Sequence, residues 1–242
     1  MNDIELNFYT TDTSVYEYAP MLLSRSKPEW WHNTPLTYTF PYVHGDMPKA
    51  TIRTCDGFNQ FHNNGFTICI PEDMTFEVGE TYSDGLTCSF DQIEVHNVEQ
   101  RGTYLPPDRY QHIKILYPWF IECEEDVKFA YICNTWSLDD PECFIIPPAV
   151  IDYKTQYAGH INMFIPYTGV KRKFTIKAGT PIVAVIPLSE RKLKITSKLI
   201  SEQKFDELIK NSDHYQRMEK RHIKKMEKHF GCPFHQIIGM KK

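Results

Sequence analysis

Three residues near the end of the chain, His229, Cys232 and His235, carry side chains that bind zinc and stand three positions apart. Structural zinc sites take four such ligands in tetrahedral geometry. No fourth ligand stands at the usual spacing, and Pro233 interrupts the run. We therefore interpret the segment as the end of a helix and predict no metal there.

A second set of potential ligands combines a His-x-Asp pair, His44 and Asp46, with the distant His160. Two histidines and a carboxylate form the facial triad of non-haem iron oxygenases, and Arg172 could bind the carboxylate of the 2-oxoglutarate cosubstrate. Because a glycine and a proline lie beside Asp46, a solvent-facing turn is the interpretation we favour. An iron oxygenase is therefore the third of three functional hypotheses, after the two given below, and we again predict no metal.

The sequence offers no familiar nucleophile or phosphate-binding motif. It has no Gly-x-Ser-x-Gly elbow, no P-loop and no dinucleotide-binding fingerprint. Its cysteines, of which Cys69, Cys88 and Cys133 lie in apolar runs, are odd in number and form no Cys-x-x-Cys pair, so we expect reduced, structural thiols. From these observations we favour a protein that is not an enzyme and needs no cofactor.

Adjacent tryptophans, Trp30 and Trp31, are candidates for binding. They lie in residues 10–49, where five prolines predict irregular chain, so we place the pair in a coil. The favoured interpretation is that one packs and the other covers a seam. The alternative is a binding platform, because tryptophan is enriched in the energetically dominant parts of interfaces. Together with Trp119 these are the predicted binding residues.

Short apolar runs separated by Pro and Gly turns set the fold prediction. They lie at residues 4–9, 50–54, 66–70, 74–78, 86–95, 112–117, 119–123, 127–133, 144–146, 160–165, 174–176 and 181–186. Such spacing is typical of antiparallel sheets. We predict a mainly β body over residues 1–200, an antiparallel sandwich or barrel, with a division into subdomains of about 1–110 and 111–200 left open.

Residues 201–242 predict a basic helical tail, with helix confined to the chain after about residue 200. Ser201 can cap a helix with Phe205, Leu208 and Ile209 on one face. A second apolar stripe follows and comprises Tyr215, Met218, His222, Met226 and Phe230. From residue 190 on, the net charge is +7, against −11 for the rest. We expect the tail to contact protein, either its own body or a neighbour, and nucleic acid is the less favoured partner.

No apolar run of 18 residues and no apolar leader stands in the sequence, which favours a soluble, non-exported protein without membrane contact.

The second half of the chain contains Ala149-Val150-Ile151-Asp152, Tyr157-Ala158-Gly159-His160-Ile161 and Gly179-Thr180-Pro181-Ile182-Val183-Ala184-Val185. These segments resemble the hairpin and closing strand of the trimeric dUTPase and dCTP deaminase family. The resemblance implies a β-clip fold here and an alternative function as a Mg²⁺-dependent nucleotide pyrophosphatase. It makes Asp152 the base that activates water and Tyr157 the support for the deoxyribose.

A wider resemblance rests on short segments spread over residues 4–200. They are residues 27–31, 66–71, 83–85, 117–120, 123–126, 134–136, 160–163 and 187–192. In them the chain resembles an uncharacterised family from tailed phages of marine bacteria, which implies a location in the host cytoplasm or the virion. The leading expectation is therefore a non-catalytic phage protein that acts by binding, as a virion component or on a host factor. Its expected partner is another protein or a second copy.

Overall fold

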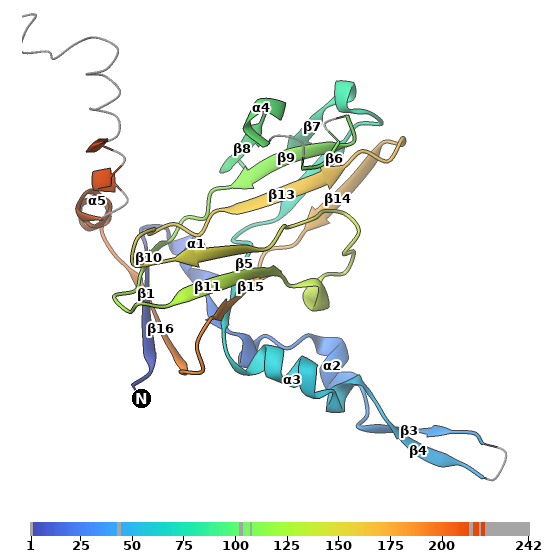
Figure 1. Cartoon of the computed structure of the whole chain (residues 1–242). Coiled ribbons are helices and arrows are strands. Elements are labelled where there is room, and N and C mark those ends of the chain that lie inside the picture. The colour runs from blue at the N-terminus through green and yellow to red at the C-terminus, as the bar shows by residue number, and fades with distance from the viewer. Residues whose placement is uncertain are drawn as a thin grey trace, which may run out of the picture.

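The computed structural model describes residues 2–42, 45–101, 104–106, 108–212, 215–217 and 219–220. Within these ranges the chain is mainly β, with several antiparallel sheets, a few short helices and a helix near the C-terminus (Figure 1). The prediction of a mainly β, antiparallel protein with a C-terminal helix is confirmed. The described sheets are open, and none of them closes into a barrel.

The largest sheet has five strands and holds the centre of the core. Its order is β12 (Ala149–Asp152), β11 (Lys128–Cys133), β15 (Pro181–Pro187), β5 (Phe66–Cys69) and β2 (Met21–Leu22). The run Ile182–Val185 of β15 is fully buried. A strand with neighbours on both sides and packing on both faces needs apolar side chains at successive positions, which explains why this segment does not alternate.

Four smaller sheets complete the fold. Their strands are β10 (Phe120–Glu122), β1 (Ile4–Thr10) and β16 (Leu193–Leu199) in the first; β13 (Ile161–Pro166), β9 (Tyr110–Ile115) and β8 (Ile93–His96) in the second; β14 (Arg172–Ile176), β6 (Met74–Val78) and β7 (Leu86–Cys88) in the third; β3 (Thr37–Phe40) and β4 (Met47–Ala50) in the fourth. All of these pairs are antiparallel except β1–β16. Strands from before and after residue 110 share sheets, because β1 pairs with β10 and β16, and β5 pairs with β15.

Helices also occur early in the chain, so the prediction of helix only after about residue 200 is wrong. The α-helices are α1 (Thr13–Glu17), α2 (Glu29–Asn33), α3 (Asp56–Asn63), α4 (Val98–Arg101) and α5 (Glu202–Asn211); the 3₁₀ helices are η1 (Leu23–Arg25), η2 (Ile52–Thr54), η3 (Tyr82–Asp84) and η4 (Thr135–Ser137). Asp12 caps α1 by accepting from the Ser14 and Val15 N–H groups. At α5, Ser201 accepts from the Lys204 N–H, as predicted.

Three predicted strands differ in the structure. Residues 50–54 are not a strand, since β4 ends at Ala50 and η2 follows. The run 86–95 is two strands, because β7 pairs with β6 and β8 pairs with β9 in another sheet. The shift of alternation within that run marks the break between them. The run 144–146 makes only an isolated bridge between Ile145 and Phe164.

Several residues singled out in the sequence lie outside the described ranges: His44, Met218, His222, Met226, Phe230, His229, Cys232 and His235. Of the helices that the structure describes, none has the length and apolar character needed to cross a membrane.

Candidate functional site

A two-stranded hairpin, β3 and β4, projects from the body (Figure 1). We call residues 37–50 the arm. Among the strands that the structure describes, β3 and β4 pair only with each other, from Thr37 opposite Ala50 to Phe40 opposite Met47. Every residue of both strands is exposed. A lone hairpin is marginally stable in water, so its persistence depends on what holds its base and what covers its faces.

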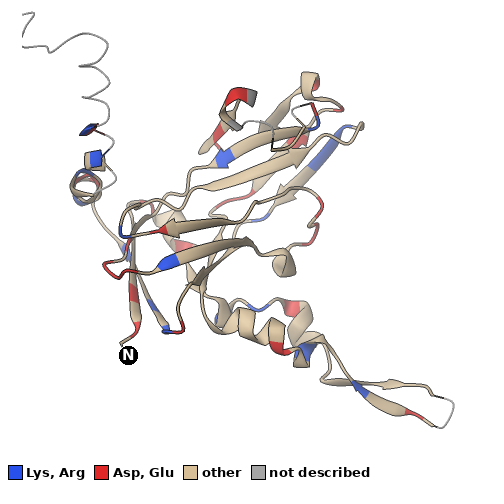
Figure 2. Cartoon of the chain, viewed as in Figure 1, with Lys and Arg blue, Asp and Glu red and all other residues tan. Residues whose placement is uncertain are grey.

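One face of the arm is mostly apolar, and Lys49, opposite Tyr38, is the charged residue of β3 and β4 on that face. Because side chains alternate along a strand, Tyr38 and Phe40 share a face with Met47 across the register. Leu36 and Tyr42 continue the same alternation on either side of β3. These five side chains are between 41% and 58% exposed. Figure 2 shows how little charge the described part of the arm carries, and its charged residues are Asp46 and Lys49.

An aromatic cluster, which we call the anchor, lies at the base of the arm. It consists of Trp30 and Trp31 of α2, Phe58 and His62 of α3, and Trp136 of η4. Phe58 is its centre and is 3% exposed. Its ring stacks on Trp31 with 6.0 Å between centroids and meets Trp136 edge-on at 5.2 Å. The anchor therefore joins α2 and α3, which flank the arm, to η4 of the body.

Cations and hydrogen bonds fix the anchor. The Lys27 Nζ lies 4.2 Å from the centre of the Trp31 ring, and the Arg53 guanidinium lies 5.0 Å from it. The Arg53 Nη1 also donates to the Thr34 carbonyl at 3.0 Å, which ties the two roots of the arm together. The Trp30 Nε1 donates to the Trp136 carbonyl at 2.9 Å.

The tryptophan pair lies on a helix, so its placement in a coil is wrong. Adjacent residues on a helix point about 100° apart, so Trp30 and Trp31 can both contact Phe58, one edge-on and one stacked. Trp31 is half-buried, whereas Trp30 is 39% exposed. Trp30 and Trp136 border a cleft of about 440 Å³ that also includes Lys27 and Asp139.

Trp119 lies elsewhere. It is 2% exposed and packs edge-on against Phe8 at 6.2 Å. Its ring is part of the core that supports β1 and presents no surface to a partner. Trp136, by contrast, was not among the predicted binding residues, because nothing in its local sequence shows that η4 meets α2.

Tyr157 lies in a cleft of about 500 Å³ between the 153–157 turn and α5. Its ring stacks on Phe120, with 5.1 Å between centroids, and burial raises the pKa of its phenol. Asp152 does not line this cleft. Its Oδ1 accepts from the Lys154 N–H at 3.0 Å, which closes the turn after β12.

The residues around Tyr157 do not fit a Mg²⁺–triphosphate. Among the described residues that line the cleft, Glu122 and Glu124 are acidic and Lys154 is basic, and the Arg217 Nη2 donates to the carbonyl of Thr155, another lining residue, at 2.8 Å. A triphosphate needs backbone N–H cradles or several cations, and two carboxylates would repel it. The roles of Asp152 as a base and Tyr157 as a sugar support stay predictions of the resemblance.

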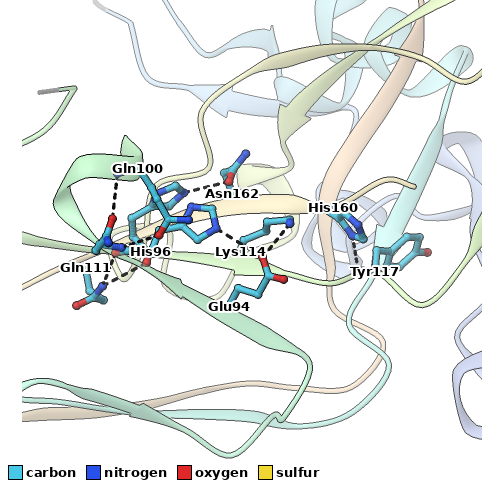
Figure 3. A network of polar contacts seen from close by, with 10 residues as sticks. Glu94, His96, Gln100, Gln111, Lys114, Tyr117, His160 and Asn162 are labelled. Atoms are coloured by element: carbon cyan, nitrogen blue, oxygen red, sulfur yellow. Dashed lines mark hydrogen bonds and ion pairs between the residues drawn. The ribbon is translucent and has the colours of Figure 1, made fainter. Parts of the chain in front are cut away.

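A polar network covers one face of the sheet formed by β8, β9 and β13 (Figure 3). The rings of His96 and His112 are 4.4 Å apart across the β8–β9 ladder. The His112 Nε2 lies 3.0 Å from the Asn162 Oδ1. Glu94 accepts from the Lys114 Nζ at 2.9 Å, and this bond lowers the pKa of the Glu94 carboxyl.

This network combines an ion pair, between Glu94 and Lys114, with a pair of imidazole rings, those of His96 and His112. The Glu94 carboxylate also lies 3.6 Å from the His96 Nε2. No group of three or more metal-ligating side chains is assembled among the described residues. The sequence alone does not reveal this network, because β8 and β9 lie apart in the chain with α4 between them, and their pairing is what brings the histidines together.

The structure places the described members of the proposed iron triad apart. The His160 Nδ1 accepts from the Tyr117 N–H at 3.2 Å beside β13 (Figure 3). Asp46 lies on the arm, just before β4. The Arg172 Nη2 donates to the Cys143 and Pro166 carbonyls, at 3.1 Å and 2.9 Å. Arg172 therefore links β14 to the end of β13 and to the segment at Cys143.

Comparisons with protein-family models, with curated proteins and with solved structures each found no match.

Proposed function

We propose that this chain is a non-catalytic protein that acts by binding another protein chain through the arm. The observation that carries the proposal is the concentration of exposed apolar side chains on the arm and on the elements beside it. Among the described residues between 30 and 52, the exposed large apolar side chains are Trp30, Leu36, Tyr38, Phe40, Tyr42, Met47 and Ile52. They belong to the arm and to the elements that hold it.

Exposure of this kind is costly unless a partner covers it. Burial of apolar surface stabilises by about 25 cal/mol per Å². An exposed patch that gathers several large apolar side chains is typical of a protein–protein interaction site. Tyrosine and methionine are enriched at such interfaces, whereas lysine and aspartate are depleted. The arm has this composition, and Lys49 is the single charge on β3 and β4.

The anchor supports the same function, because it fixes the base of the arm to the body. Phe58 and Trp31 stack at the base, and Arg53 ties the roots of the arm together. A rigid base lowers the entropy that the arm loses on binding. The resemblance to a tailed-phage family agrees with a role as a virion component or as a protein that binds a host factor.

The test is removal of the arm. Residues 37–50 are replaced by a short Gly-Ser turn that joins Leu36 to Thr51, which leaves α2, α3 and the anchor in place. We expect circular dichroism and thermal unfolding to stay close to those of the full chain, because β3 and β4 pair with no other strand in the described part of the chain. We expect loss of self-association in sedimentation and of the proteins that the full chain retains from a lysate of its source cells, identified by mass spectrometry. An armless chain that keeps the same oligomeric state and the same retained proteins would refute the proposal.

A further inference from the structure

The arm has two edges, and the hydrogen-bond pattern shows which groups each edge presents. The Thr51 N–H donates to the Leu36 carbonyl at 3.1 Å, next to the first pair of the β3–β4 ladder. Bonded and non-bonded pairs alternate in an antiparallel ladder. The pairs that Thr37 and Thr39 make with β4 are therefore the non-bonded ones. Their N–H and C=O groups point to the outer edge of β3.

The outer edge of β4 is blocked. Pro48 stands opposite Thr39, in a non-bonded pair, so its ring nitrogen lies on the outer edge. Proline has no N–H to donate, and a proline at this position is a common means of closing an edge strand to pairing. The edge of the arm that stays open to a partner strand is thus that of β3.

Two prolines limit the open edge to two residues. Pro35 and Pro41 lie two positions before Thr37 and two positions after Thr39, so they have the same outward phase and lack the N–H group. The segment reads Pro-Leu-Thr-Tyr-Thr-Phe-Pro, which is nearly symmetric about Tyr38. Its backbone donors keep their positions when the segment is reversed.

This near-symmetry suits a second copy of the same segment, and the register centred on Tyr38 pairs the threonines of the two copies with each other. When a second β3 approaches antiparallel about Tyr38, Thr37 of each copy faces Thr39 of the other, and all outward N–H groups find carbonyls. A shift by two residues in either direction places a threonine opposite Pro35 or Pro41, so the carbonyl of that threonine has no donor, although the total number of interchain hydrogen bonds is unchanged. Closed homo-oligomers most often use such two-fold contacts, in which the same surface meets itself.

Side chains and charge agree with the same arrangement. Tyr38 would face its own counterpart in a non-bonded pair, where cross-strand side chains lie closest, with Leu36 opposite Phe40 on the same face. The mostly apolar faces of the two arms would then lie side by side on the same side of the four-stranded sheet. Residues 35–42 carry no charge, so two copies meet without like-charge repulsion.

We infer that a second copy of this chain pairs with the arm, β3 against β3 in antiparallel orientation, to form a four-stranded sheet centred on Tyr38. The inference rests on the proposed function of the arm and names its partner.

The first test compares the same substitution on the two edges. Thr39→Pro removes an outward N–H from β3, whereas Ala50→Pro removes one from β4, and both positions are in non-bonded pairs of the hairpin. Each dimer loses two hydrogen bonds in Thr39→Pro, so we expect about thirtyfold weaker association by sedimentation equilibrium. Ala50→Pro should associate like the unmodified chain. A monomeric full chain at about 100 µM, or equal effects of the two substitutions, would overturn the inference.

The second test asks whether the partner is a copy of the chain. Tyr38→Lys and Tyr38→Glu each place like charges opposite each other across the two-fold axis. Lys49, opposite position 38 in the same hairpin, adds to the repulsion in Tyr38→Lys and partly balances the charge in Tyr38→Glu, so Tyr38→Lys alone should be monomeric and Tyr38→Glu alone should associate more weakly than the unmodified chain. Their equimolar mixture should restore dimers, because the charges become opposite. Failure of the mixture to associate would overturn self-pairing. If the armless chain loses a partner while Tyr38→Lys and Thr39→Pro keep it, the proposed function stands and self-pairing is refuted.

Discussion

Replacement of Phe58 by alanine should release the arm and its two helices from the body. The Phe58 ring is 3% exposed and contacts Trp30, Trp31, His62 and Trp136. Removing a buried phenylalanine side chain costs about 3–5 kcal/mol in the free energy of unfolding. With four aromatic neighbours, of which the Trp136 pair is edge-to-face and the Trp31 pair stacked, the loss should lie near the upper end, at about 4 kcal/mol.

Urea unfolding followed by tryptophan fluorescence measures this cost, because three of the four tryptophans lie in the anchor and Trp119 lies in the core. We expect an early transition from the anchor, followed by the main transition of the body. Phe40→Ala is the matched control, since it removes the same ring from an exposed position of the arm and should change stability by about 0.5 kcal/mol or less. If Phe58→Ala costs less than about 1 kcal/mol, or leaves one transition with unchanged fluorescence, the anchor does not hold the arm.

Two further predictions concern pH. Burial lowers the pKa of His62 from its ordinary value of 6.5, so the folded chain keeps a neutral ring while the unfolded chain gains a proton below that value, and stability should fall as the pH drops from 7 to 5. His62→Phe should flatten this part of the pH profile of unfolding free energy, and an unchanged slope would exclude His62 as its source. Hydrogen bonds from Arg191, at 2.9 Å and 3.1 Å, lower the pKa of Glu125. The stability that this pair supplies is present above the ordinary carboxyl pKa and is lost as the pH falls through the lowered one, so Glu125→Gln should lose stability at pH 7 and show a smaller further loss in acid, measured by thermal unfolding.

Much of the strand content follows from local sequence. The run 74–78 alternates between buried and exposed residues and is β6. The run 181–186 is continuously apolar and is the central strand β15. Ser201 and the apolar spacing after it predict α5. In each case the side chains alone specify which face is buried or which N–H is capped, so no distant contact is needed to make the prediction.

Short helices escaped prediction because local side-chain bonds and distant contacts decide them. Residues 50–54 alternate like a strand, but the Thr51 hydroxyl accepts from the Arg53 N–H and turns the chain into η2. Isolated helices as short as α2 and α3 are not stable by propensity. Phe58 and Trp31 stabilise both of them by stacking across the anchor.

The near-symmetric segment at residues 35–41, with no charge and with alternating apolar side chains, is visible in the sequence without any structure. The tertiary structure was needed to show that, among the described strands, β3 and β4 pair with no other, and that Pro48 closes one edge while the other stays open. The same holds for His96 and His112, which β8 and β9 bring together, and for the anchor around Phe58. The physical reason is that alternation specifies a strand and its buried face, whereas the identity of a strand's neighbours depends on contacts between residues far apart in the chain.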